Sequence, residues 1–212
     1  MRIVKPEFNV WAMTEGNPQA LMALIEKCGR LCYKSEGRIA DGSADTFLRN
    51  IIKRGHEAVL EHGVITMHLV CDRGVSHELV RHRIASYCQE STRYCNYSKG
   101  DFGSEITVIE PLYLQHGTEA YDVWEKGCRT AEMAYFDLLT IGATAQEARA
   151  VLPNSLKTEV AVTMNIREWR HFFRLRCSAA AHPQMREVAT IGLQKMYDML
   201  PVLFEDVYKE VL

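Results

Sequence analysis

The sequence lacks the patterns that would place the protein in a membrane, outside the cell or among general nucleic-acid binders. No apolar run reaches the roughly 18 residues that a membrane-spanning helix requires. The N-terminal stretch MRIVKPEFNVW has neither the apolar segment nor the small-residue cleavage site of a signal peptide. The formal net charge is -2 at pH 7, whereas general affinity for nucleic acids usually comes with a basic surface. We therefore expect a cytoplasmic protein without a membrane or nucleic-acid partner.

Two familiar kinds of binding motif are also absent. No G-x-G-x-x-G occurs, so a Rossmann nucleotide site is not supported. The seven cysteines include no C-x-x-C pair, which leaves zinc and a redox dithiol unsupported, and we expect reduced, mostly buried thiols. The histidines of HEAVLEH, His56 and His62, do not have the spacing of the zinc motif H-E-x-x-H. We therefore expect hydrogen bonding in that segment and no metal.

The chain has the length and apolar content of one globular domain. It contains 212 residues, of which 47% are hydrophobic, with no repeat and no linker rich in Gly, Pro or Ser, so we expect a single domain over residues 1–212. Mixed helices and strands without βαβ regularity predict an α+β fold with a mixed or antiparallel sheet and several long helices. Apolar periodicity predicts helices over 17–33, 43–55, the segment after Asp72, 118–140, 144–152, 167–176 and 183–200, and strands over 63–71, 106–111 and 156–166.

Positive charge is concentrated in RHRIASYCQESTRY, residues 81–94, which carries three arginines. Guanidinium groups bind phosphate oxygens through paired hydrogen bonds, and the Ser91 hydroxyl with loop N–H groups would add uncharged donors. An exposed helix end whose cations complement the helix dipole would explain Arg81 and Arg83. It would not explain the polar run after them, which we expect to form a loop. The segment therefore indicates an anion site.

A second basic cluster lies in NIREWRHFFRLRCSAAAHPQMRE, residues 165–187. Helical spacing places several of its cations on one side, with Trp169, Phe172 and Leu175 available to face the core. Like charges on one face repel unless an anionic partner or carboxylates offset them, and Glu168 is the one acid within the densest part. We therefore expect an anionic ligand here. The cations on that side are Arg167, Arg170, His171 and Arg174.

These motifs resemble a known family. Arg81-His82-Arg83, followed by seven residues and Ser91, is similar to the R-H-R-x7-S signature of flavin-dependent thymidylate synthases. Five further stretches fall in the family's order, at 55–62, 147–153, 164–169, 175–177 and 182–187. The resemblance implies homotetramers of α+β subunits with active sites built by several chains. It implies conversion of dUMP to dTMP, with methylenetetrahydrofolate as carbon donor, NADPH as reductant and FAD as hydride carrier.

The same resemblance implies two sets of ligand-binding residues. For FAD they are Ala58, Arg81, His82, Arg83, Gln89, Asn165, Ile166, Arg167, His171 and His182, with His56 beside the flavin. For dUMP they are Glu78, Leu79, Val80, Arg81, Gln89, Glu90, Ser91, Thr92, Arg93, Arg149 and Arg176. Arg176, Ser91 and His56 are implied to take part in catalysis. Arg176 would activate the uracil, and Ser91 would bind and position the phosphate.

Two departures from the family pattern concern the flavin. Ala58 stands where the family often has Ser or Thr, so a hydroxyl contact is lost and backbone contact remains. Two extra residues separate Arg176 from His182 relative to some relatives. His171 occupies a position that is often Asn in the family.

Other interpretations of the arginine segments lead to different chemistry. A nucleotide- or RNA-binding module without catalysis would use Tyr87, Tyr94 and Tyr97 as stacking surfaces, but no RNP or KH pattern occurs. A flavin-dependent tRNA-uracil methyltransferase would be expected to show a Gly-rich dinucleotide motif. Nucleophilic catalysis by Ser91 would need a base, and no G-x-S-x-G elbow is present. No Cys-His dipeptide exists either, and we interpret Cys88 and Cys95 as packing residues.

Overall fold

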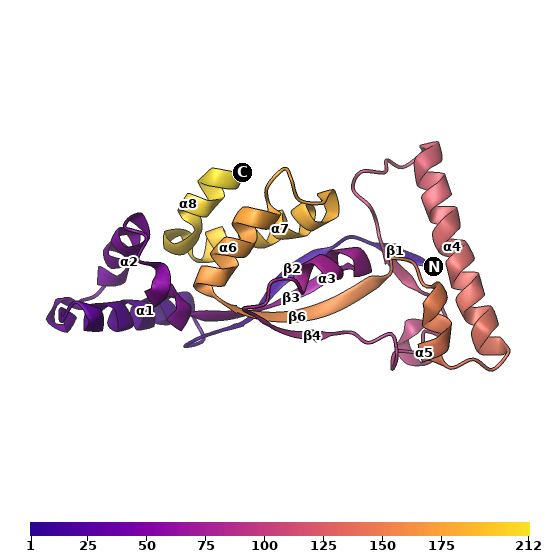
Figure 1. The fold of residues 1–212 in the computed structure, drawn as a ribbon, viewed down its shortest axis with the longest axis horizontal. Coiled ribbons are helices and arrows are strands. Elements are labelled where there is room, and N and C mark those ends of the chain that lie inside the picture. Colours follow the sequence, from indigo (N-terminus) through magenta and orange to yellow (C-terminus); the bar gives the residue numbers. More distant parts are fainter. The chain divides into compact units, whose positions relative to one another are not determined.

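The computed structural model describes the backbone of residues 1–212 and every side chain except that of residue 101. The chain, drawn in Figure 1, divides into two compact units. The first unit comprises residues 1–7, 69–81 and 88–160, and the second unit comprises residues 8–68, 82–87 and 161–212. The expectation of a single domain over 1–212 stays a prediction. No helix in the described part of the chain is long and apolar enough to cross a membrane.

The strands form one sheet of four strands and one of two. The four-stranded sheet has the order β2-β3-β6-β4, and β1 pairs in parallel with β5. An isolated antiparallel bridge joins Val108 to Leu156, so both kinds of pairing occur. The strands are β1 (Arg2–Val4), β2 (Glu7–Met13), β3 (Val64–Asp72), β4 (Ser86–Gln89), β5 (Thr107–Ile109) and β6 (Lys157–Asn165). Together with the helices below, they confirm the predicted α+β fold with a mixed sheet.

The long strands follow the alternation seen in the sequence. Ile65, Met67 and Leu69 of β3 are fully buried, while the residues between them are half-buried. Val160 and Val162 of β6 are buried in the same alternating manner. Because successive side chains of a strand point to opposite faces, this pattern fixes which face packs into the core.

The first unit contains three α-helices and two 3-10 helices among the described residues. They are α3 (Arg73–Leu79), α4 (Glu119–Thr140), α5 (Ala145–Ala148) and the 3-10 helices η3 (Gly100–Phe102) and η4 (Arg149–Val151). Thr118 starts α4, because its Oγ1 accepts the Tyr121 N–H at 3.3 Å. The core beneath contains Ile106, Val108 and Tyr135, all fully buried. The helices predicted over 118–140 and after Asp72 are confirmed.

The second unit holds the aromatic core and most of the helices. Trp169, Phe172 and Phe173 of α6 pack edge-on or stacked against one another, and Phe8 of β2 joins them. Asn17 starts α1 by accepting the N–H of Ala20 at 2.9 Å. The helices are α1 (Pro18–Cys32), α2 (Ser43–Lys53), α6 (Ile166–Arg176), α7 (Pro183–Met199) and α8 (Pro201–Val211), with the 3-10 helices η1 (Glu36–Arg38) and η2 (Glu57–His62).

The structure differs from the sequence prediction in a few local elements. The helix predicted over 183–200 is confirmed as α7, which ends at Met199, and Pro201, which fits the first turn of a helix, begins the unpredicted helix α8. Strand β2 was absent from the sequence prediction because Phe8 is its one buried residue, which leaves little alternation to detect. Gln89, expected in a loop, ends strand β4.

The cysteines also differ from expectation. All seven are free thiols, but Cys32 and Cys88 are exposed and three of the seven are buried, so the prediction of mostly buried thiols is wrong. Cys88 is therefore not a packing residue. Burial raises the pKa of Cys71 to about 12, so this thiol does not supply a thiolate at neutral pH.

Candidate active site

A buried hydrogen-bond chain runs through His82 in the second unit. The Arg176 Nε–H donates to His82 Nε2 at 2.9 Å, and His82 Nδ1 lies 3.3 Å from Glu168 Oε1. Because Nε2 accepts from a guanidinium, the proton of a neutral His82 belongs on Nδ1, from which it is donated to Glu168. His82 and Glu168 are 6% and 9% exposed. The chain therefore fixes the direction of the Arg176 side chain.

The surroundings of His82 favour the uncharged imidazole. Burial lowers the pKa of His82, Arg176 lowers it further, and the hydrogen bond to Glu168 opposes both without restoring the ordinary value. His171 also lies close, with ring centroids 6.0 Å apart. Ligand-type atoms of His82, Glu168 and His171 lie within 4.8 Å of one another. Both ring nitrogens of His82 already have partners, so we assign this cluster to the hydrogen-bond chain.

Tyr87 holds the turn that carries this histidine. Its hydroxyl donates to the His82 carbonyl at 2.6 Å, and burial, aided by the charge of Glu168, raises the pKa of Tyr87 to about 12. Arg81 and Arg83 on either side are exposed. Neither guanidinium has a hydrogen bond or ion pair among the described residues, so both remain available to an anionic ligand.

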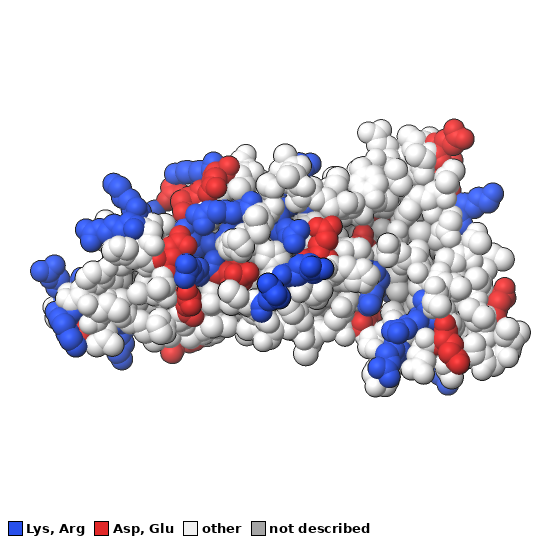
Figure 2. All heavy atoms as spheres, viewed as in Figure 1, with Lys and Arg blue, Asp and Glu red and all other residues white. Residues whose placement is uncertain are grey.

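Carboxylates from other elements neutralise most of the arginines on α6, which corrects the expectation of unpaired charge. Arg167 pairs with Glu61 at 2.6 Å, and Arg170 binds Asp206 of α8 through both carboxylate oxygens, at 2.6 and 2.7 Å. Figure 2 shows acidic and basic side chains interleaved over α6 and α8. Arg170 is fully buried, and it is not on an open basic face as predicted.

Three further partners complete this network. Arg170 also binds Glu57 of η2 at 2.9 Å and the Leu203 carbonyl, and Arg174 binds Glu210 at 2.9 Å. Leu175, expected to face the core, is 48% exposed, so that prediction is wrong. Trp169 and Phe172 do face the core, as predicted. A free anion is therefore not required to balance the charge of α6.

Three residues of the predicted flavin set line one cavity of about 460 Å³ in the second unit. Asn165 starts α6 by accepting the Glu168 N–H at 2.8 Å, which directs Arg167 and His171 of the next turns to the same side. Glu57 and Glu61 line the cavity as well. The lining thus offers guanidinium and imidazole donors together with carboxylate acceptors.

The other predicted flavin residues of the second unit lie outside that lining. His56 Nδ1 is 2.7 Å from the Tyr33 hydroxyl, and Ala58 is exposed on η2. Ile166 is fully buried, so its side chain is not presented to a ligand. His182 starts α7, where its Nδ1 accepts the N–H of Gln184 at 3.3 Å.

In the first unit, the predicted phosphate segment is anchored by neutral hydrogen bonds at its start. Gln89 Nε2 donates to Ser76 Oγ at 2.9 Å and to Thr158 Oγ1 at 3.2 Å. The Glu90 carboxylate pairs with Lys157 at 3.2 Å. Gln89 and Glu90 therefore have protein partners that fix the segment, and the side chains after them are the ones left for a ligand.

The turn that follows contacts Arg149. The family resemblance implied that Arg149 and this segment bind the same ligand. Arg149 Nη1 donates to Thr92 Oγ1 at 3.5 Å, although 57 positions separate them. Ser91 Oγ accepts the Arg93 N–H at 3.3 Å, and neither an imidazole nor a carboxylate bonds to this hydroxyl among the described residues. Among the described residues, Ser91 therefore lacks the base that a serine nucleophile requires.

The remaining predicted nucleotide residues lie at the end of α3. Glu78 is half-buried, Leu79 is fully buried and Val80 is 40% exposed. The side chain of Leu79 packs in the core of the first unit, so Glu78 and Val80 are the two that reach the surface.

Sequence reasoning missed two positioning residues. Arg73 Nη1 donates to the Glu90 carbonyl at 3.3 Å and supports the start of the phosphate segment. Glu168 was noted for its charge and not as the partner of His82. A charged residue directly after a buried strand, as Arg73 is, could have been noticed in the sequence. Its partner could not have been identified, because the Glu90 carbonyl lies 17 positions away in the chain.

Each unit therefore holds a set of arginines with uncharged donors beside them, on an α+β fold. The fold and these sets define a class of protein that binds anionic, phosphate-bearing ligands through guanidinium groups.

Comparisons with known proteins narrow this class to a family. The family model described as thymidylate synthase complementing protein matches residues 16–202. The flavin-dependent thymidylate synthase of Pyrococcus furiosus is 36% identical over 85% of this chain and 75% of its own length. That of Geobacter sulfurreducens is 36% identical over 90% of this chain and 82% of its own. The chain belongs to the flavin-dependent thymidylate synthase family, and the resemblance of its motifs is confirmed.

A solved structure agrees at the level of the fold. The UMP/dUMP methylase PolB from Streptomyces cacaoi, bound with 5-Br dUMP, matches with a TM-score of 0.78. The match covers 99% of this chain and 97% of that chain, at 22% identity. At this identity, the match shows that the two chains share a fold.

Proposed function

We propose that the protein is a flavin-dependent thymidylate synthase, which methylates dUMP reductively to dTMP. Methylenetetrahydrofolate supplies the carbon and NADPH supplies the reducing equivalents. Family membership over residues 16–202 supports the reaction class. The observation that carries the proposal is the cavity of the second unit, where Asn165, Arg167 and His171 come together as the flavin set requires.

FAD fits the residues of the second unit. Asn165, Arg167 and His171 would hold it at the cavity of about 460 Å³, a volume in the range of small-molecule sites. Arg83 is exposed and would add a further cation, whereas both ring nitrogens of His82 are already bonded to Arg176 and Glu168. Guanidinium groups suit the pyrophosphate, and carboxylates such as Glu61 suit ribose hydroxyls. When bound, FAD supplies hydride transfer, which no amino-acid side chain provides.

The dUMP phosphate is assigned to the first unit. Ser91, Thr92 and Arg93 would bind its oxygens through hydroxyl, backbone N–H and guanidinium donors, with Arg149 as a further cation. Gln89 and Glu90 hold the segment in place through their bonds to Ser76 and Lys157, so the donors are ordered before the ligand arrives.

Arg176 is assigned to the uracil. Negative charge develops on the ring as the reaction proceeds, and a guanidinium aimed at that charge stabilises the transition state more than the ground state. His82 accepts the Arg176 Nε–H and is itself held by its hydrogen bond to Glu168. The guanidinium group of Arg176 therefore has a fixed orientation. A neutral His82 is essential to this role, because a protonated imidazole could not accept the Arg176 N–H.

We also propose homotetramers with active sites shared between subunits, and a cytoplasmic location. The family resemblance supports the homotetramer, and the sequence patterns described above are the basis for the proposed location.

Flavin binding tests this function first. The purified protein is expected to show the visible absorption bands of FAD or to acquire them on titration with FAD. His171→Ala should weaken FAD binding by about tenfold, through loss of one ligand in the cavity. The matched control is His116→Ala, an exposed histidine of the first unit. A colourless protein that takes up no FAD would contradict the proposal.

A further inference from the structure

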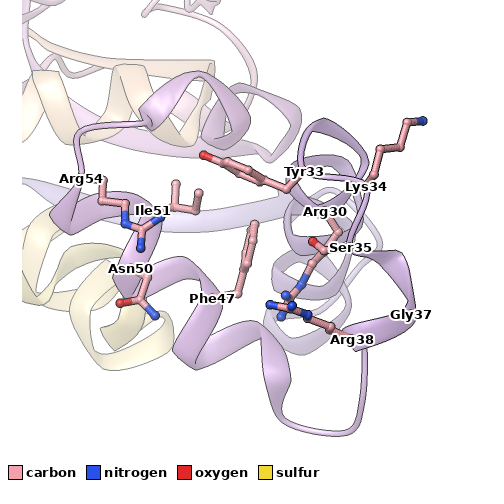
Figure 3. A pocket seen from close by; sticks show the side chains of 10 residues that line it. All are labelled: Arg30, Tyr33, Lys34, Ser35, Gly37, Arg38, Phe47, Asn50, Ile51 and Arg54. Carbon is pink, nitrogen blue, oxygen red and sulfur yellow. The ribbon is translucent and has the colours of Figure 1, made fainter.

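A second cavity of the second unit lies outside the flavin cavity and takes no part in the roles assigned above. Its volume is about 570 Å³, and it lies where α1, η1 and α2 meet. Figure 3 shows its lining side chains, with Arg30 and Arg38 beside Phe47 on one side, Asn50 and Arg54 on the other, and Tyr33 above. We call it the arginine pocket.

The arginine pocket has a strongly positive lining. Arg30, Arg38 and Arg54 line it together with Lys34, and none of its ten lining residues is acidic. The guanidinium groups of Arg38 and Arg54 are exposed and have no hydrogen bond or ion pair among the described residues. In Figure 3 the Lys34 side chain points away from the cavity. Two uncommitted guanidinium groups on one cavity are suited to a phosphate group.

Arg30 is held in position from beneath. Glu26 is 2% exposed and accepts from Arg30 Nε at 3.0 Å and Nη2 at 2.8 Å, while the Ser43 hydroxyl donates to the same carboxylate. The guanidinium carbon of Arg30 lies 4.6 Å from the centroid of the Phe47 ring. This buried support gives the cavity a preorganised wall of guanidinium and aromatic ring, which lowers the entropy cost of binding.

The close approach of α1 to α2 creates that wall. A Cβ atom on Gly29 would lie 2.6 Å from the Phe47 ring, so the absence of a side chain at this position lets the ring occupy its place. Tyr33 is 48% exposed and adds a second aromatic surface. Aromatic faces with adjacent guanidinium groups suit a stacked base that carries phosphate.

Tyr33 connects the arginine pocket to the proposed flavin region. Its hydroxyl lies 2.7 Å from Nδ1 of His56, and the two rings are stacked with an interplanar angle of 19°. A ligand in the pocket would therefore begin one side chain away from a residue that the family resemblance places beside the flavin.

From these features we infer that the arginine pocket binds the 2′-phosphoadenosine part of NADPH. The choice of NADPH rests on the proposed function, whereas the phosphate and base recognition rest on the pocket itself. Phe47 and Tyr33 provide the aromatic surfaces for the adenine. Arg38, which lies beside Arg30, provides the charge that the 2′-phosphate requires, and Arg54 adds a further cation across the cavity. NADH, which lacks that phosphate, binds here more weakly.

Calorimetric titration of the purified protein with adenosine 2′,5′-bisphosphate tests the pocket without any catalytic step. The wild type should bind, and Arg38→Gln and Arg54→Gln should each weaken binding by about tenfold. Lys27→Gln removes the same charge from an exposed position of α1 outside the lining and should leave the affinity unchanged. Equal affinity in all four proteins, or no binding by the wild type at millimolar concentration, would overturn the assignment.

Two competing ligands identify the chemistry. Adenosine 5′-monophosphate should bind more weakly than the bisphosphate, and equal affinity would refute recognition of the 2′-phosphate. Displacement of the bisphosphate by tetraglutamate at equal concentration would instead assign the arginines to a carboxylate tail, such as that of folate, and would overturn the adenosine assignment.

Steady-state kinetics separate this inference from the proposed function. In dTMP formation, Arg38→Gln should raise the KM for NADPH about tenfold while the KM for dUMP stays constant. Product formation with an unchanged KM for NADPH would refute the pocket and leave the function intact. Loss of bisphosphate binding in the variants of a protein that forms no dTMP would refute the function and leave the phosphoadenosine site intact.

Discussion

At the scale of single residues, His82 determines how Arg176 can act. The imidazole lies between a carboxylate and a guanidinium, and burial keeps it neutral, so it accepts from Arg176 and donates to Glu168. Arg176 is thereby held at the C-terminal end of α6, where its Nε–H is donated to His82 and the orientation of its guanidinium group is set. Placement of the guanidinium before the reaction is what makes electrostatic stabilisation effective.

Replacement of Arg176 tests this role. Arg176→Ala should lower kcat for dTMP formation by a factor of about 10² to 10³, since loss of one donor to developing negative charge typically costs that much. FAD content should change little, whereas the free energy of unfolding should fall by about 1–3 kcal/mol, because the buried His82 Nε2 loses its donor. Arg186→Ala, an exposed arginine on α7, is the control. Near-normal turnover by Arg176→Ala would contradict the assignment.

The neutral state of His82 predicts a dependence of stability on pH. The pKa of His82 is lowered in the folded protein, so the unfolded chain binds more protons once the pH falls below the ordinary value of about 6.5. Stability should therefore decrease from pH 6.5 downward, by at most about 1.4 kcal/mol per pH unit for this one proton. Urea denaturation at several pH values from about 5 to about 8, on both sides of the ordinary histidine pKa, would measure this decrease in stability.

His82→Gln provides the comparison for that measurement. The variant cannot titrate at this position, so its stability should decrease less than that of the wild type over the same interval. Parallel curves for the two proteins would show that His82 is not held neutral by the fold.

At the scale of elements, α6 combines structural and ligand-facing roles on different sides. Asn165 starts the helix, Arg167 and His171 face the flavin cavity, and Trp169 and Arg170 are buried. Burial by itself would raise the pKa of Asp206 and lower that of Arg170. Their hydrogen bonds and mutual attraction outweigh burial, so the pKa of Asp206 is lowered and that of Arg170 is raised. The pair joins α6 to α8.

Removal of Arg170 should therefore destabilise the fold. Arg170→Ala is expected to lower the free energy of unfolding by about 1.5–3 kcal/mol, because it removes the charge-assisted hydrogen bonds of a fully buried guanidinium group, while Asp206 is 42% exposed and keeps Arg174 as a partner. Arg174→Ala removes a more exposed arginine that also binds Asp206, and should cost at most about 1 kcal/mol. Similar urea midpoints for the two variants would contradict a structural role specific to Arg170.

The sequence predicted α6 almost to the residue, but not which of its arginines would be free. Helical spacing located the helix and its apolar side, since Trp169 and Phe172 repeat at the required interval. The partners Glu57, Glu61 and Asp206 lie 36 to 113 positions away, so no local pattern could pair them with Arg167 and Arg170. Local periodicity specifies an element, whereas ion pairing depends on how the elements pack.

At the scale of the whole molecule, ordered motifs predicted more than periodicity did. The family, with its reaction and ligands, followed from R-H-R-x7-S and the stretches that accompany it, whereas the mixture of predicted helices and strands gave the fold class; both the family and the fold class are confirmed. The arginine pocket had no such signal, because Arg30 lies in α1, Arg38 in η1 and Arg54 directly after α2, and these segments meet only in the folded unit. The roles of individual site residues stay predictions that the variants above would test.

The central claim concerns the reaction, and the most direct test is transfer of the methylene carbon to free dUMP. The protein with FAD would be incubated anaerobically with NADPH, dUMP and methylenetetrahydrofolate labelled in its one-carbon unit. The account predicts labelled dTMP that requires all three substrates and disappears in Arg176→Ala. Oxidation of NADPH without labelled dTMP in the wild type would contradict it.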